Sequence, residues 1–153
     1  MTPSITVVSS FAVIFLFVAT AATADDYKQL SLSVYVDDDL SKALVAGYIC
    51  DPSGLSFLNS SERIYEQDTG MLYAVTDSLV KSQGQSWDIA FPLSGYYDEY
   101  HAIFYIPGGA ELKEMDCSQG LVFLSSNYND SLVLNVHGFD ITDPEVNIRF
   151  SIS

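Results

Sequence analysis

Positive charge is scarce in this sequence. Six Lys and Arg residues stand against twenty Asp and Glu, which gives a formal net charge of -14 at pH 7. A protein that binds DNA or RNA needs cationic side chains to neutralise phosphates, and docking on anionic lipid needs them as well. The composition therefore argues against nucleic-acid partners. It suits a protein that stays soluble through self-repulsion, or one whose partner is cationic.

Residue types that carry out catalysis are also few. Only two histidines occur, His101 and His137, and there is no Gly-x-Ser-x-Gly motif, so a serine-hydrolase set cannot be assembled. His101 shares a strand face with Ile103, which predicts a half-buried histidine with a backbone partner. Asp98 and Glu99 alternate onto opposite strand faces, unlike the paired carboxylates of a glycosidase. We expect no enzyme, with an extracellular hydrolase as the alternative.

The sequence has only two cysteines, Cys50 and Cys117. Two thiols without a second pair do not make a four-ligand zinc site. An even number of cysteines in an exported chain indicates one disulfide, which would stabilise the fold by about 4 kcal/mol because it closes a long loop. The alternative is a pair of buried free thiols.

Residues 7–24 contain no charged side chain, and their densest apolar part, residues 11–19, is shorter than the ~20 residues of a bilayer span. The segment ends in Ala22-Thr23-Ala24, a small-x-small pattern that signal peptidase accepts. We predict that residues 1–24 form a hydrophobic signal helix and that the protein is secreted or lies at the cell surface. Because no Lys or Arg precedes this segment, an uncleaved membrane anchor is the alternative. Export would make the Asn-x-Ser sequons at Asn59 and Asn129 candidate glycosylation sites.

Short apolar alternations of period two dominate residues 25–153, and turn residues separate them. This pattern predicts one all-β domain, an antiparallel β-sandwich of about eight strands with immunoglobulin-like connections. A closed barrel is the alternative. The expected strands cover residues 30–36, 43–50, 63–66, 71–75, 87–91, 100–106, 111–117, 121–125, 132–136 and 146–152, and residues 76–81 form either a strand end or one helical turn.

Two features of these strands lead to further expectations. Tyr100–Ile106 is apolar on both faces, which predicts a central strand that is buried on both sides. Gly47 lies inside a strand pattern, which predicts a bulge or a close approach of another backbone. The abundant acidic charge should protect edge strands from pairing with other chains.

Carboxylates cluster in two expected loops. One holds Asp37–Asp39 and the other holds Asp140, Asp143 and Glu145. Oxygen ligands suit Ca²⁺, although neither loop has the spacing of an EF-hand. The simpler interpretation is a solvated cap on a turn. We expect no cofactor, with calcium as the alternative.

An acidic and aromatic segment precedes the central strand. It consists of Tyr96, Tyr97, Asp98, Glu99 and Tyr100. Tyrosines combine a large apolar ring with a polar tip and are enriched at interfaces. We therefore predict that this segment is a surface for a partner, either another envelope protein or a glycan.

Three segments carry a resemblance to a known family: Tyr96–His101, Ile103–Pro107, and Leu132–Val136 with the later Asp143-Pro144. They resemble the extracytoplasmic β-sandwich of archaeal, notably methanogen, envelope proteins. The resemblance rests on strand patterns and implies an exported β module without a catalytic signature. This chain lacks the C-terminal span and the winged-helix domain of the anchored forms, so a regulatory role does not carry over.

Together these observations predict a secreted or envelope-associated β-sandwich that works by contact and not by catalysis. The alternatives are a calcium- or glycan-binding surface domain and an extracellular hydrolase. A membrane contact is expected only if residues 1–24 stay attached. The sequence leaves the ligand, the oligomeric state and the biological process open.

Overall fold

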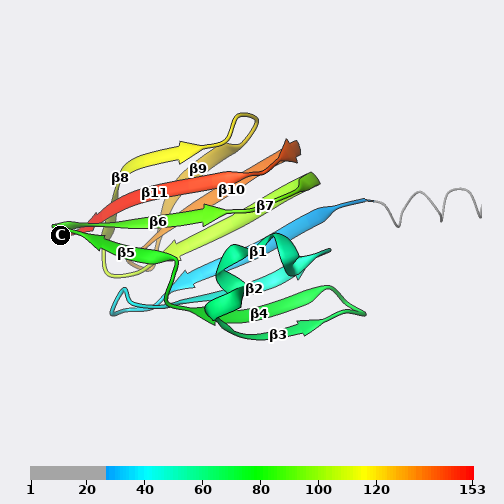
Figure 1. Cartoon of the computed structure of the whole chain (residues 1–153). Helices are drawn as coiled ribbons and strands as arrows, with labels where there is room; N and C mark the ends of the chain where they lie inside the picture. The colour runs from blue at the N-terminus through cyan, green and yellow to red at the C-terminus, as the bar shows by residue number, and fades with distance from the viewer. Residues whose placement is uncertain (1–26) are drawn as a thin grey trace, which may run out of the picture.

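The computed structural model describes residues 27–153, so the predicted signal segment lies outside the described residues. Two β-sheets pack face to face (Figure 1), and two short 3-10 helices, η1 (Pro52–Gly54) and η2 (Ser56–Ser60), lie beside them. The strands are β1 (Gln29–Val36), β2 (Ala43–Ile49), β3 (Glu62–Glu66), β4 (Met71–Thr76), β5 (Val80–Gln83), β6 (Ser86–Pro92), β7 (Tyr96–Ile106), β8 (Ala110–Cys117), β9 (Val122–Tyr128), β10 (Ser131–Thr142) and β11 (Glu145–Ile152).

The large sheet has seven strands in the order β3-β4-β2-β1-β7-β10-β9, and the small sheet has four in the order β5-β6-β11-β8. This confirms the predicted all-β sandwich. The strand count exceeds the expected eight because every short candidate forms a strand, including β5. All pairs are antiparallel except β1 with β7, which run in the same direction. Within residues 27–153, no helix has the length and apolar character to span a membrane.

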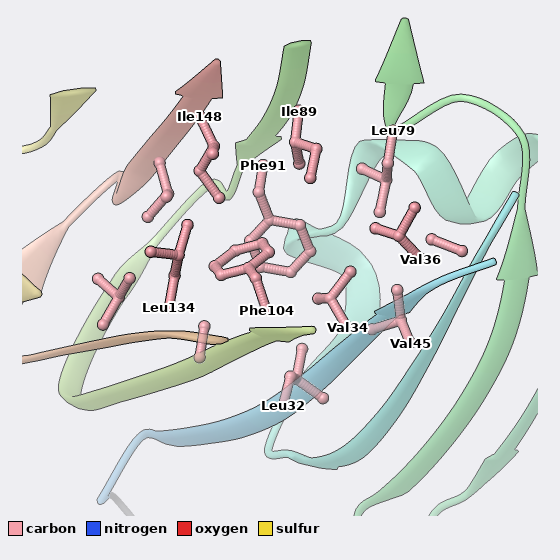
Figure 2. Close-up of a cluster of buried hydrophobic side chains, with 14 of the residues drawn as sticks. Leu32, Val34, Val36, Val45, Leu79, Ile89, Phe91, Phe104, Leu134 and Ile148 are labelled. Atoms are coloured by element: carbon pink, nitrogen blue, oxygen red, sulfur yellow. The ribbon is translucent and has the colours of Figure 1, made fainter. Parts of the chain in front are cut away.

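Buried aliphatic side chains fill the space between the sheets, with the rings of Phe91 and Phe104 among them (Figure 2). Phe91 of β6 and Phe104 of β7 meet edge to face, with ring centroids 5.5 Å apart and planes at 88°. Phe57 of η2 lies 5.8 Å from Phe91, so η2 covers part of the core that the small sheet leaves open. Alternation along the strands explains this burial, because inward positions such as Val34 and Ile148 carry apolar side chains.

The central strand β7 is buried on one face only. Ala102, Phe104 and Ile106 are fully buried between the sheets. Ile103 and Tyr105 point outward and are half-buried. The prediction that both faces of this strand are covered is therefore wrong for the described part of the chain, and its outward apolar residues need another explanation.

Gly47 marks a close backbone approach, one of the two predicted outcomes. Its φ is +140°, and a Cβ at this position would overlap the carbonyl oxygen of Ser31 and lie 3.1 Å from Leu32 Cα. The register of β1 with β2 runs unbroken through the pair Leu32 and Gly47, so no bulge occurs. Glycine lets β1 and β2 lie together in the middle of the large sheet.

Candidate functional site

The structure divides the predicted partner surface at Tyr96–Tyr100. Tyr97 is 4 % exposed and Tyr100 is fully buried, whereas Tyr96 is exposed and Asp98 and Glu99 are half-buried. Strict alternation would put Tyr97 and Tyr100 on opposite faces. The strand alternation changes at Asp98 and Glu99, so both tyrosines enter the core. They cannot touch a partner of the folded protein, and the five-residue surface is corrected to its outward members.

The acidic residues of this segment are engaged in internal hydrogen bonds. Tyr96 Oη donates to Asp140 Oδ1 at 2.6 Å and to Asp98 Oδ1 at 3.2 Å. Asp98 Oδ2 accepts from Lys28 N at 2.7 Å. The hydrogen bond to Asp140 is the main cause that raises the pKa of Tyr96, so the phenol stays protonated.

The carboxylate of Glu99 also accepts internal hydrogen bonds. Its Oε2 accepts from Tyr27 Oη and from Gln29 Nε2, both at 3.2 Å. Together with the Asp98 bond, these contacts fix the start of β1 against β7. Asp98 and Glu99 therefore hold β1 against β7 through hydrogen bonds, and they do not face each other across a cleft.

The hydroxyl of Tyr100 has no hydrogen-bond partner, although the residue is fully buried. Burial raises the pKa of this phenol far above its ordinary value. A buried unpaired hydroxyl costs about 1–3 kcal/mol of stability. We therefore expect Tyr100→Phe to raise the free energy of unfolding, measured by urea denaturation, by about 1 kcal/mol.

Tyr97→Phe is the matched control for Tyr100→Phe. Tyr97 Oη donates to Ser94 O at 3.5 Å, so this variant loses a hydrogen bond and should be neutral or slightly destabilised. A loss of more than about 1 kcal/mol in Tyr100→Phe would show that its hydroxyl has a partner in solution.

Neither acidic loop forms a metal cage. Asp37 Oδ1 accepts from Ser41 N and Lys42 N, and Asp39 Oδ1 accepts from Ser41 N and Oγ. Asp143 Oδ1 accepts from Gly95 N at 2.7 Å. Among residues 27–153, no group of three or more His, Cys, Asp or Glu side chains could hold a metal ion. Hydrogen bonds within the protein thus engage these aspartates, and calcium binding stays an alternative prediction.

The two histidines lie opposite each other on β7 and β10. His101 is half-buried, and its Nε2 lies 2.9 Å from Asn135 Oδ1, so its partner is a side chain and not the predicted backbone group. His137 is exposed and packs edge to face on Phe139, with ring centroids 5.2 Å apart. Among residues 27–153, neither ring makes a hydrogen bond to a serine, a cysteine or a carboxylate.

Cys50 and Cys117 are both free and half-buried, so the structure does not support the predicted disulfide. Cys50 follows β2, whereas Cys117 ends β8, which packs opposite β10. Burial, with Asp116 nearby, raises the pKa of the Cys117 thiol.

Both sequons are accessible. Asn59 lies in η2 and Asn129 lies in the turn between β9 and β10, and both side chains are exposed. Their glycosylation stays a prediction, as do the signal and the export of the chain.

The outer face of the large sheet is the surface that the sequence patterns did not reveal. One row of side chains crosses all seven strands. In strand order it reads Ile64, Tyr73, Ala46, Ser33, Ile103, Asn135 and Leu124, so two of its members are polar. The row beside it brings the rings of Tyr35 and Tyr105 together, stacked at 4.7 Å and 6°. We name this surface the outer apolar face; its exposed large side chains are Tyr35, Leu44, Ile64, Tyr73, Val75, Val122, Leu124, Tyr128 and Phe139.

Charge is nearly absent from the outer apolar face. Its acidic side chains, Glu62, Glu66 and Glu99, lie at the β3 edge and at one end of β7. A chain with a net charge of -14 therefore keeps its acids off the middle of this sheet. The sequences of β2 and β4 contain a pattern that could have predicted the outer apolar face, because Ala43–Ile49 and Met71–Thr76 are also apolar on both faces.

The outer face of the small sheet shows the opposite character. Lys81, Asp88, Arg149 and Glu114 lie in one row across its strands. Arg149 Nε donates to Asp88 Oδ1 at 2.8 Å, and its Nη1 lies 3.4 Å from Glu114 Oε2. The hydrogen bond from Arg149 lowers the pKa of Asp88. These residues border a shallow groove of about 350 Å³, in which the guanidinium is already paired with carboxylates.

No protein-family model matches this chain, and no curated protein matches it. The resemblance to archaeal envelope sandwiches therefore stays a prediction, and the argument for function rests on the two outer faces.

Proposed function

We propose that this chain is a non-catalytic interaction module, exported from the cell, that docks a partner protein on its outer apolar face. The single observation that carries the proposal is the contrast between the two sheets. One outer face is almost uncharged and carries aromatic and aliphatic side chains on both sides of a polar centre at Ser33, His101 and Asn135, and the other carries a row of charged side chains. Exposed apolar patches of this extent mark interaction sites.

The size of the face suits a protein partner. Strands lie about 4.8 Å apart, so seven of them make a face roughly 30 Å wide, and three rows of side chains make it roughly 20 Å tall. The resulting area of roughly 600 Å² approaches the ~800 Å² that each partner contributes to a standard interface. Tyrosine, which is enriched in such interfaces, occurs at Tyr35, Tyr48, Tyr73 and Tyr105.

The charge distribution defines the chemistry of the partner. Glu62, Glu66 and Glu99 border the face, and the rest of the molecule is strongly acidic. Complementarity then requires a partner surface with an apolar centre and a cationic rim. A glycan is less well served, because Tyr35 and Tyr105 stack on each other and so cover the ring faces that a sugar would need.

A titration with a synthetic peptide of alternating leucine and lysine tests the proposal. We expect the full-length chain to bind this peptide, followed by calorimetry, with amide NMR shifts confined to the large sheet. Tyr73→Glu places a charge in the central row of the outer apolar face, on β4 next to the edge strand β3, where Tyr73 is 45 % exposed, and should weaken binding at least tenfold.

Ala90→Glu is the matched control, because it adds the same charge at an exposed position on the outer face of the small sheet. It should leave the peptide affinity within about twofold, because Ala90 lies on the outer face of the small sheet. The two changes alter net charge equally, so a difference between the variants reports the position of the charge. Unchanged or tighter binding by both variants, or binding of polylysine as tight as that of the Leu/Lys peptide, would mean that bulk charge alone attracts the peptide and would overturn the proposal. Co-sedimentation with an insoluble glycan, without peptide binding, would replace it with the glycan alternative.

A further inference from the structure

The four sheet edges of residues 27–153 are not equally protected. Edge strand β3 carries Glu62, Arg63 and Glu66, β5 has only four residues and carries Lys81, and β8 alternates acids with Lys113. Charged side chains and short length are the usual protection against edge-to-edge pairing. The fourth edge, β9, reads VFLSSNY and has no charged residue. The expectation that acidic charge protects every edge is therefore wrong at β9.

Strand β9 is also the most exposed strand of the sandwich. All seven of its residues are exposed, with Val122 at 60 %, Leu124 at 72 % and Tyr128 at 69 %. Phe123, on the opposite side, is 45 % exposed because β9 extends past the cover of the small sheet. The strand thus offers apolar side chains on both faces beside a free edge.

The backbone groups on that edge follow from the hairpin that joins β9 to β10. Asn129 and Asp130 have φ values of 48° and 61°, as in a two-residue type I′ turn. Such a turn is closed by a pair that exchanges both hydrogen bonds, here Tyr128 with Ser131. Hydrogen-bonded pairs then recur at every second residue. The N–H and C=O groups of the remaining residues, Phe123, Ser125 and Asn127, point away from β10.

We propose that β9 pairs antiparallel with β9 of a second copy of this chain, around a two-fold axis at Ser125. This register places Ser125 opposite Ser125 and Phe123 opposite Asn127 of the other copy. It is the register in which every outward N–H and C=O of β9 finds a partner. The two large sheets become one continuous sheet, and the two outer apolar faces lie side by side.

The occupant is a second copy because the register is self-complementary in charge and in side chains. Val122 lies opposite Tyr128, a β-branched and aromatic pair that favours sheet pairing. The acid nearest to the strand, Asp130, lies opposite Gly120 of the other copy, so no carboxylate faces a carboxylate. With -14 on each chain, an uncharged strand is the edge on which two copies meet with least repulsion. This inference does not depend on the partner proposed for the outer apolar face.

Sedimentation velocity of the full-length chain at increasing concentration and salt tests the proposal. We expect a monomer–dimer equilibrium that shifts toward dimer as salt rises to about 1 M, where the Debye length is about 3 Å. Ser125→Lys places two ammonium groups on the two-fold axis and should abolish the dimer. The same substitution lowers the net negative charge, so bulk repulsion alone predicts the opposite change.

Ile64→Lys is the matched control, because it adds the same charge at an exposed position of the other edge strand of the large sheet, where Ile64 is 65 % exposed. It should leave the dimer intact. A chain that stays monomeric under all these conditions, or a dimer that persists in Ser125→Lys, would overturn the proposal. So would loss of the dimer in both lysine variants.

Cysteine substitutions test the register. Residues that face each other in a hydrogen-bonded pair have Cα atoms about 5.5 Å apart, which a disulfide can bridge. Ser125→Cys should therefore form a covalent dimer on oxidation. Asn127→Cys should not, because its counterpart in the other copy lies roughly 14 Å away along the strands. Both variants keep Cys50 and Cys117, so only the new thiol differs; a crosslink through Asn127→Cys and not through Ser125→Cys would refute this register.

Discussion

Replacing Phe104 with alanine is expected to lower the free energy of unfolding by about 3–5 kcal/mol. Phe104 of β7 is fully buried, and its ring meets Phe91 edge to face across the two sheets. The truncation removes the transfer free energy of the ring and leaves a cavity between layers that strand pairing holds apart. Since small domains have a stability of only about 5–15 kcal/mol, this one change removes a large part of the total.

Urea denaturation followed by far-ultraviolet circular dichroism measures the effect. Leu124→Ala is the control, because Leu124 lies on the same sheet but is 72 % exposed, and its loss should change stability by less than about 0.5 kcal/mol. If both variants lost the same stability, the outer face would be as well packed as the core, and the outer apolar face would not be free for a partner.

The strands could be predicted from the sequence because their signal is local. Residues 30–36, 132–136 and 146–152 alternate with period two, and each falls within a strand of the structure. The order of the strands could not be predicted. The parallel contact of β1 with β7 joins residues about seventy positions apart, and no turn residue records such a pairing.

The exposed apolar face of the large sheet could not be distinguished from a buried face in the sequence, for a related reason. Two-sided apolar strands such as Tyr100–Ile106 predict burial on both faces, because burial is the usual cause of that pattern. In the structure only one layer covers them, and the outward side chains form an exposed face. Tyr97 and Tyr100 show the converse error, since a change in alternation at Asp98 takes both rings into the core. Periodicity locates strands well. It cannot tell whether the second apolar face of a strand is covered by another layer of the same protein or lies exposed at the surface.

The second large effect is expected at Gly47, where alanine should destabilise the fold by about 3 kcal/mol. Two costs add at this position. A φ of +140° is strained for any residue with a Cβ, and the new methyl group would overlap the backbone of Ser31, which cannot move without parting β1 from β2. The pair β1–β2 lies in the middle of the large sheet, so the register that aligns Tyr35 with Leu44 on the outer apolar face would be disturbed as well.

Gly84→Ala separates these two costs. Gly84 also has a positive φ, +67°, but nothing lies within 4 Å of a Cβ built on it. Its substitution should therefore cost only the conformational strain, about 1–2 kcal/mol. Chemical denaturation of both variants gives the comparison, and equal losses would mean that β1 and β2 separate easily. In that case the large sheet would accommodate the new methyl group by bending, and it would not be the rigid docking face that we propose. The Leu/Lys peptide should then bind Gly47→Ala as well as it binds the unmodified chain.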